Sequence, residues 1–157
     1  MRYENPPCHL ALFEPEIPPN TGNISRLCAG NGIPLHLVGK LGFTLDDKQL
    51  KRAGLDYWPH VDLRLHQNLD ELRTSMPGAR LWLFSTKSKA LFTSVRYQPG
   101  DCLVFGPETR GLPESFLSAH PEDCVIIPMR ANTIRSLNLS SAAAIGLYEA
   151  LRQMEER

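Results

Sequence analysis

Three polar segments that follow the last apolar runs of the chain carry residue types suited to binding an anion. They are residues 85–89 (STKSK), 106–113 (GPETRGLP) and 128–136 (PMRANTIRS), and Glu108 is their sole carboxylate. Polar loops that are rich in glycine, proline or arginine carry function more often than packing. Because positive charge with few acids favours an anionic ligand, the sequence predicts a binding site formed by these segments.

The net charge is zero, but the charges are unevenly distributed along the chain. Lys and Arg number 17, as do Asp and Glu. Residues 73–100 and 124–148 contain no acid, and their basic residues are Arg73, Arg80, Lys87, Lys89 and Arg96, followed by Arg130 and Arg135. A solvated surface explains such runs as well as a local anionic partner does, so charge alone leaves both interpretations open.

Several common catalytic and metal-binding patterns are missing from the sequence. The cysteines, at positions 8, 28, 102 and 124, form no C-x-x-C pair, and the histidines show no H-E-x-x-H spacing. A G-x-S-x-G elbow and a G-x-x-x-x-G-K-[ST] loop are also absent. Residues 30–35 (GNGIPL) lack the third glycine of a dinucleotide fingerprint and precede a strand. The sequence therefore disfavours serine hydrolases, metalloenzymes and Rossmann enzymes, and we expect no metal.

Short apolar runs alternate with helical patterns along the whole chain, which favours an α/β fold with a parallel sheet. Strands are predicted over residues 9–13, 34–38, 61–65, 80–85, 101–105 and 124–127. Helices are predicted over residues 21–31, 47–53, 68–76, 113–119 and 136–154, with Asp46 and Asn68 as N-caps and Gly32 and Gly54 as helix ends. Since ligands bind beyond the carboxyl ends of parallel strands, the three polar segments are expected to meet at that edge.

Length and composition favour a single domain over residues 1–157, with its first strand near residue 9. Hydrophobic residues make up 42% of the 157 residues, which is enough for one core. No apolar run approaches the roughly 20 residues that a membrane span needs, and residues 1–7 (MRYENPP) lack the apolar segment of a signal peptide. We expect a cytoplasmic protein that does not associate with a membrane.

Three segments in register resemble the SPOUT superfamily of knotted RNA 2′-O-ribose methyltransferases. They are residues 14–26 (EPEIPPNTGNISR), 105–113 (FGPETRGLP) and 127–140, which contains IPM followed by RSLNLS. Within the superfamily the chain resembles the compact enzymes that methylate cytidine or uridine 34, the wobble nucleotide of tRNA. The resemblance implies a parallel sheet flanked by helices, a C-terminal trefoil knot, and leucine tRNAs as substrates.

The resemblance also implies the cofactor and the residues that bind it. S-adenosylmethionine is the methyl donor and S-adenosylhomocysteine the product, and no metal is needed because the sulfonium methyl group is already electrophilic. The implied cofactor contacts are Phe84, Gly106, Ile127, Ser136, Leu137 and Leu139. A glycine suits a position where the backbone approaches a ligand closely, and apolar side chains suit the walls of a pocket.

For the reaction itself the resemblance implies Arg26, Glu108, Ser136 and Asn138. A guanidinium stays protonated, so Arg26 suits orienting a phosphate and stabilising a developing alkoxide rather than accepting a proton. Glu108 either accepts the proton or holds Arg110. Ser136 and Asn138 either serve the site or cap the last helix. The implied substrate contacts are Asn20, Asn23, Lys87, Arg130 and Arg135.

A run of small residues over 140–146 (SSAAAIG) would let another helix approach the last helix closely. Burial within one subunit explains this run too, but the related enzymes dimerise through their first and last helices. We therefore expect a homodimer whose surface holds the anticodon loop of tRNA. Two alternatives remain at this point: methylation of another tRNA or rRNA nucleotide, and a catalytically silent RNA-binding protein.

Overall fold

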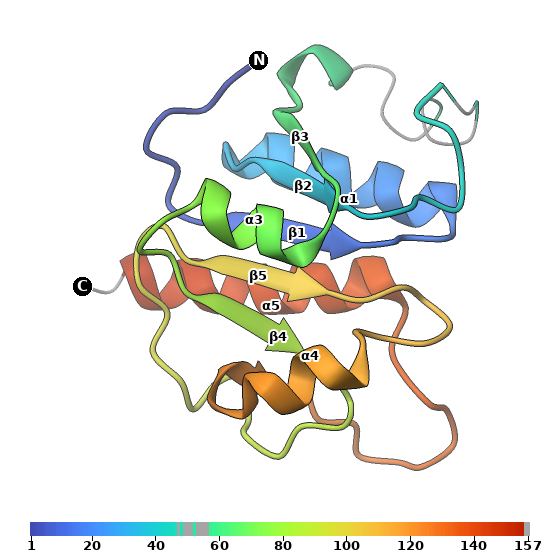
Figure 1. Cartoon of the computed structure of the whole chain (residues 1–157), viewed down its shortest axis with the longest axis vertical. Coiled ribbons are helices and arrows are strands. Elements are labelled where there is room, and N and C mark those ends of the chain that lie inside the picture. The colour runs from blue at the N-terminus through green and yellow to red at the C-terminus, as the bar shows by residue number, and fades with distance from the viewer. Residues whose placement is uncertain (47, 49–51, 53–56, 156–157) are drawn as a thin grey trace.

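The computed structural model describes the whole chain except residues 47, 49–51, 53–56 and 156–157. The helix predicted over residues 47–53 and its end at Gly54 therefore lie largely outside the described residues. The fold consists of a central sheet with helices on both faces, and the two ends of the chain lie apart (Figure 1).

The described strands form one parallel sheet in the order β3-β2-β1-β5-β4-β6, which confirms the predicted fold class. The strands are β1 (His9–Phe13), β2 (Leu35–Val38), β3 (Leu63–His66), β4 (Leu81–Phe84), β5 (Cys102–Phe105) and β6 (Cys124–Val125). β3 starts later than predicted because Val61 still closes a 3₁₀ turn, η1 (Trp58–His60). β6 is shorter than predicted because Ile126 continues only as an isolated bridge to Leu91.

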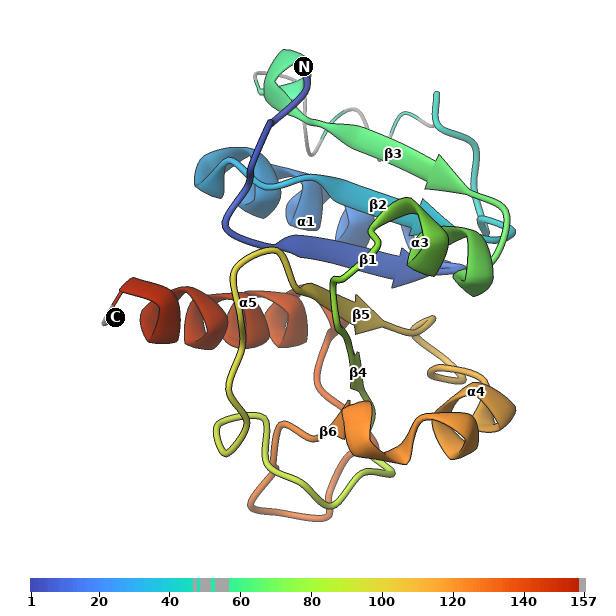
Figure 2. The same ribbon diagram turned by 60° about the vertical axis from the view of Figure 1, so that its left-hand side comes forward.

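Helices cover both faces of the sheet (Figures 1 and 2). One face carries α1 (Pro18–Asn31) and α5 (Leu139–Glu155), and the other carries α3 (Leu69–Ser75) and α4 (Glu114–Ala119), with the 3₁₀ turn η2 (Pro121–Asp123) before β6. α1 begins earlier than predicted because proline is tolerated in the first helical turn. None of the helices in the described residues is long and apolar enough to cross a membrane.

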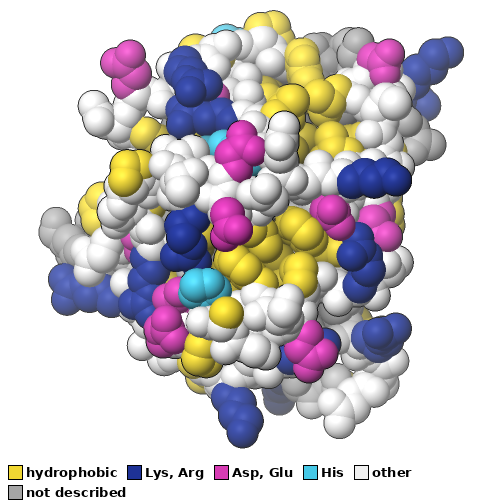
Figure 3. Space-filling model, in the orientation of Figure 1, with side chains coloured by type: hydrophobic (Ala, Val, Ile, Leu, Met, Phe, Trp, Pro, Cys, Tyr) yellow, Lys and Arg dark blue, Asp and Glu magenta, His cyan; other side chains and the backbone are white. Residues whose placement is uncertain are grey.

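Each face of the sheet has its own core. Ile24 of α1 and Leu147 of α5 pack with Leu10 of β1 on one face. On the other face Leu72 of α3 and Leu117 of α4 pack with strand side chains. Figure 3 shows that apolar side chains remain visible between α3 and α4, within a rim of charged side chains.

Two of the predicted helix ends are confirmed by their geometry. Asn68 caps α3, since its side chain accepts a hydrogen bond from the backbone N–H of Glu71 at 2.8 Å. Gly32 ends α1 in the left-handed conformation with φ of 64°, which glycine adopts without strain.

Three histidines form a chain of hydrogen bonds across β1, β2 and β3, in which His9 and His36 are buried and His66 is half-buried. His9 Nδ1 lies 2.9 Å from His36 Nε2, and His36 Nδ1 lies 2.8 Å from His66 Nε2. Burial disfavours the charged imidazolium and lowers the pKa of His9 from 6.5 to about 4, and it lowers the pKa values of His36 and His66 as well. Arg64 lies nearby and lowers all three pKa values further, while Asp62 raises those of His9 and His36.

The histidine chain predicts a loss of stability in mild acid. The unfolded chain binds protons near pH 6.5, whereas the folded chain binds them only at lower pH, so stability is complete above 6.5 and falls toward pH 4. A shift of this size for His9 corresponds to about 3 kcal/mol. His36→Gln should make the pH dependence of the urea midpoint shallower, while His60→Gln, at an exposed position, should leave it unchanged. An unaltered slope in His36→Gln would contradict this explanation.

Candidate active site

The three polar segments meet at a cavity beyond the carboxyl ends of β4 and β5, as the sequence predicted. The cavity has a volume of about 530 Å³, within the range of small-molecule sites. Its walls come from the residues after β4, the loop of residues 106–112 after β5, residues 127–138 and the start of α5, and α1 contributes Asn20.

All six residues predicted to contact a cofactor line this cavity: Phe84, Gly106, Ile127, Ser136, Leu137 and Leu139. Phe84 is held from behind, since its ring stacks on Phe105 with centroids 4.5 Å apart. Gly146 of α5 lies against the same ring, and a Cβ at that position would approach Phe84 to 3.0 Å. The apolar wall of the cavity is therefore rigidly supported by the core.

The structure gives a second reason for a glycine at position 106, besides the predicted close approach to a ligand. A Cβ at Gly106 would overlap the backbone of Gly111 and Leu112, which belong to the same loop. The loop of residues 106–112 thus folds back on its own first residue, and a side chain there would displace the backbone. Glycine is therefore needed for the shape of the loop, which in turn shapes the cavity.

Glu108 contacts the first turn of α1 and the residues before it, and it does not contact Arg110. Its Oε1 accepts a hydrogen bond from Glu16 N–H at 2.8 Å, and its Oε2 accepts from Ile17 N–H at 2.9 Å and from Asn20 Nδ2 at 3.2 Å. Arg110 pairs with Glu14 at 2.9 Å, and this hydrogen bond lowers the pKa of Glu14. The hypothesis that Glu108 holds Arg110 is therefore wrong.

Asn138 caps α5, which was one of the two roles predicted for it. Its Oδ1 accepts hydrogen bonds from the backbone N–H of Ser140 at 2.9 Å and from the Ser140 hydroxyl at 2.6 Å. Ser136 lies in the loop before the helix, since α5 begins only at Leu139, and it is exposed on the rim of the cavity. Both residues line the cavity, so the cap that Asn138 forms through its Oδ1 does not remove it from the site.

Comparisons with known proteins show the family to which the chain belongs. The model of the SpoU rRNA methylase family matches residues 7–148. The chain belongs to this family. It is 52% identical over 145 residues to a tRNA (cytidine(34)-2′-O)-methyltransferase of Methylovorus glucosotrophus, covering 92% of this chain and 94% of that protein. A tRNA (cytidine(34)-2′-O)-methyltransferase of Yersinia pestis is 50% identical over 153 residues, with 93% of each chain covered.

The fold also superposes on solved structures of RNA methyltransferases. One described as giving structural insights into the 2-OH methylation of C/U34 on tRNA superposes with a TM-score of 0.90 at 49% identity, covering 96% of this chain and 97% of that one. The SpoU methyltransferase AviRb of Streptomyces viridochromogenes, solved in complex with AdoMet, has a TM-score of 0.81 at 23% identity and covers 95% of this chain and 61% of that one. At that identity the likeness shows the fold alone.

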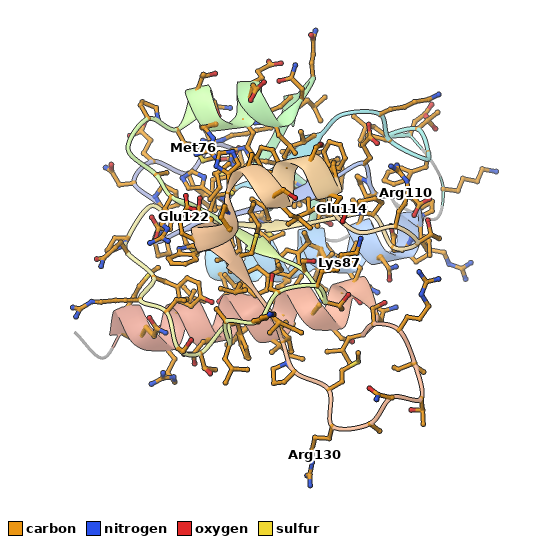
Figure 4. All side chains as sticks on the ribbon, turned by 60° about the horizontal axis from the view of Figure 1, so that its bottom comes forward. Met76, Lys87, Arg110, Glu114, Glu122 and Arg130 are labelled. Atoms are coloured by element: carbon orange, nitrogen blue, oxygen red, sulfur yellow. The ribbon has the colours of Figure 1, made fainter. Side chains whose placement is uncertain are left out.

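The predicted substrate residues divide between the cavity of this SpoU family member and its surroundings. Asn20, Lys87 and Arg135 line the cavity. Arg130 extends away from the body of the molecule at the tip of its loop (Figure 4), and Asn23 lies exposed on α1. The predicted positions therefore form a rim and an outer surface rather than one pocket.

Arg26 lies outside the cavity wall. It is exposed on α1, and its guanidinium carbon lies 5.4 Å from the centre of the Tyr57 ring. It lies six positions after Asn20, which corresponds to about 9 Å along the helix. From this place Arg26 is suited to a phosphate of a long substrate rather than to the cofactor.

The cavity fits S-adenosylmethionine in size and in chemistry. Phe84, Ile127 and Leu139 offer apolar walls, while Ser136 and the peptide groups of residues 106–112 offer hydrogen bonds to polar groups. Lys87, Arg110 and Arg135 place positive charge around the opening, where a nucleic acid would approach.

Sequence reasoning missed two residues at this edge of the sheet, Glu16 and Thr109. Glu16 Oε1 accepts hydrogen bonds from the Thr109 N–H at 2.9 Å and from its hydroxyl at 2.7 Å. These bonds lower the pKa of Glu16. Both residues lie inside the segments that carried the family resemblance. Their place in those segments was the one feature of the sequence that could have indicated them as site residues.

One group of possible metal ligands occurs in the described residues, at the opposite end of the sheet. The ligand atoms of His120, Glu122 and Asp123 lie within 4.8 Å of one another. Asp123 already accepts a hydrogen bond from Arg80 Nε at 2.7 Å. These residues precede β6 and are not part of the cavity wall.

Proposed function

We propose that this protein is an S-adenosylmethionine-dependent methyltransferase that modifies the ribose 2′-hydroxyl of nucleotide 34 in tRNA. The observation that carries the proposal is the convergence of the three family segments on one cavity of about 530 Å³ with a cationic rim. Two relatives that are named for this reaction at position 34 match nearly the whole chain, at 52% and 50% identity. We further propose leucine tRNAs with cytidine or uridine at the wobble position as substrates.

The residues of this chain have separate tasks in the proposed reaction. S-adenosylmethionine, when bound, supplies an electrophilic methyl group on sulfur. Phe84, Ile127 and Leu139 hold the cofactor, and Ser136 faces the reacting region from the rim. Alignment of two bound reactants contributes about 7–11 kcal/mol to such a transfer, so these residues act mainly by positioning. Arg26 orients a phosphate beside the target ribose and stabilises the alkoxide that develops on its oxygen.

We propose a homodimer formed through α1 and α5. Ile145 and Tyr148 are apolar or aromatic side chains of α5 that are 41% and 56% exposed. Asn31 of α1 lies beside them, with its Nδ2 3.4 Å from the Tyr148 hydroxyl. A second copy would cover this surface and extend the binding area for tRNA. Because the substrate is tRNA, we also propose that the protein acts in the cytoplasm.

We propose a trefoil knot in the C-terminal part of the chain. After β6 the chain runs past residues 90–92, where Ile126 N–H donates to the Ala90 carbonyl at 2.8 Å and Phe92 N–H donates to the Ile126 carbonyl at 2.9 Å. The end of α5 then contacts the same segment, since Gln153 Nε2 donates to the Val95 carbonyl at 2.9 Å. These contacts bring two parts of the C-terminal chain against residues 90–95, and they support the proposed knot.

The proposed function is tested by mapping ribose methylation. The purified protein is incubated with S-adenosylmethionine and with tRNA from a strain that lacks the gene, and the tRNA is digested and analysed by mass spectrometry. We expect one new 2′-O-methyl group at nucleotide 34 of leucine tRNAs. Methylation at another nucleotide would replace the proposed substrate, and no methylation of tRNA or rRNA would indicate a catalytically silent RNA-binding protein.

We expect RNA binding to depend on salt despite the zero net charge. Lys87 and Arg135 on the rim and Arg130 on the outer loop are placed to contact phosphates. Each phosphate contact contributes a slope of about −0.7 to −0.9 to log affinity against log salt. Arg130→Ala should reduce this slope by about one contact, whereas Arg96→Ala, at the amino end of the sheet, should leave it unchanged. A flat salt response of the unaltered protein would contradict the proposed contacts.

A further inference from the structure

Two glutamates connect the segment before α1 to the loop after β5 in a reciprocal way. Glu108 in the loop accepts hydrogen bonds from the backbone of Glu16 and Ile17, while the Glu16 carboxylate accepts from Thr109 beside Glu108. A further contact of 3.0 Å joins the Thr109 hydroxyl to Glu16 Oε2. We call these contacts the Glu16–Glu108 clamp.

The clamp lies at the start of α1, which has no side-chain cap. Ile17 occupies the N-cap position and offers no side-chain hydrogen bond, and the next two residues are prolines without an N–H. The carboxylate of Glu108 instead accepts from the N–H of the N-cap residue Ile17 and from the side chain of Asn20 in the first turn, and a negative charge is favourable at a helix N-terminus. The start of α1 is thus fixed to the loop of residues 106–112, which forms a wall of the cavity.

The hydrogen bonds of Glu108 also bear on its chemical role. Its Oε2 has two donors and its Oε1 has one, and all three donors belong to residues 16–20. A general base must reach the proton that it removes, within about 2.6–3.2 Å. Glu108 also lines the cavity, but three of its roughly four lone-pair positions face residues 16–20, and a proton on the carboxylate would weaken these charge-assisted hydrogen bonds. Its geometry is therefore that of an anchor.

We propose that Glu108 and Glu16 are positioning residues for the methyl transfer, an inference that rests on the proposed function. The clamp holds α1, and with it Arg26, in a fixed relation to the cofactor loop. The Glu108 carboxylate does not take the proton of the ribose hydroxyl. Displacement of reacting groups by about 1 Å is enough to lower a rate by about 100-fold, so a weakened clamp should reduce turnover.

The two glutamates should respond differently to glutamine. In Glu108→Gln an amide NH₂ replaces one of two oxygens that both face N–H donors, and the clamp is broken. In Glu16→Gln the remaining oxygen still accepts both bonds from Thr109, because Oε1 makes both in the native protein. We expect kcat to fall about 10- to 100-fold in Glu108→Gln and about 10-fold in Glu16→Ala, and to stay within about 3-fold of wild type in Glu16→Gln.

The test combines turnover, pH dependence and amide exchange. Glu122→Gln is the matched control, since its carboxylate is exposed beyond the cavity wall. Amide protection at Glu16 and Ile17 should be lost in Glu108→Gln and kept in the control. The pH profile of kcat at saturating cofactor and tRNA should keep its shape in Glu108→Gln, because a positioning residue changes the height of the profile only.

Three outcomes overturn the proposal. A pH profile of Glu108→Gln that loses a limb would make Glu108 the proton acceptor. Unchanged kcat in Glu108→Gln would show that the clamp does not serve the reaction. Equal losses in Glu16→Gln and Glu16→Ala would show that charge rather than the hydrogen bonds matters at position 16. If wild type methylates no RNA, the proposed function itself fails, and exchange at Glu16 and Ile17 reports the clamp separately.

Discussion

Gly106→Val should weaken binding of S-adenosylhomocysteine by about 100-fold or more, while the sheet stays folded. A side chain at this position would overlap the backbone of Gly111 and Leu112, and neither backbone group can turn away as a flexible side chain would. The loop of residues 106–112 must then move out of the cavity wall. Loss of two hydrogen bonds to the cofactor, each about 1–1.5 kcal/mol, already corresponds to about 100-fold in affinity.

Calorimetry with S-adenosylhomocysteine measures this effect directly, and circular dichroism with urea unfolding shows that the variant is folded. Gly30→Ala is the matched control, because a Cβ at Gly30 meets no other atom within 4 Å. It should bind the ligand with native affinity. Native affinity in Gly106→Val would mean that the loop after β5 is not part of the cofactor site.

The sheet could be predicted from the sequence because nearly every strand is apolar on both faces. Residues such as Leu81 and Leu83 face one core while Trp82 and Phe84 face the other, so the runs are continuous rather than alternating. The caps at Asn68 and Gly32 were predictable for a similar reason, since each depends on a few neighbouring residues. Local chemistry and local pattern are sufficient for such features.

Contacts between distant segments could not be predicted in the same way. His9, His36 and His66 meet only through the register of three strands, and nothing in their spacing indicates this. The predicted partner of Glu108 was wrong for the same reason. The nearby Arg110 suggested a local ion pair, whereas the hydrogen-bond donors to Glu108 lie about ninety residues earlier in the chain. The loop residues that line the cavity could be predicted from their place after the strands, whereas their hydrogen-bond partners could be identified only from the folded structure.

Arg26→Ala should leave S-adenosylhomocysteine affinity near wild type and lower methyl transfer by about 10²- to 10³-fold. Arg26 is exposed on α1 and does not line the cavity, so the cofactor does not depend on it. In the proposed reaction its loss removes a donor to the phosphate and to the developing alkoxide. Arg26→Lys should recover only part of the rate, because an ammonium keeps the charge but not the planar pair of donors.

Turnover is measured at saturating cofactor and tRNA, so that a binding defect does not imitate a chemical one. Arg96→Ala removes an arginine near the amino ends of β4 and β5 and should retain wild-type turnover. Full activity of Arg26→Lys would show that charge suffices and that the two-donor geometry is irrelevant. Full activity of Arg26→Ala would remove Arg26 from the reaction. Because the clamp already occupies Glu108, the search for the group that assists the hydroxyl would then turn to Ser136 on the rim.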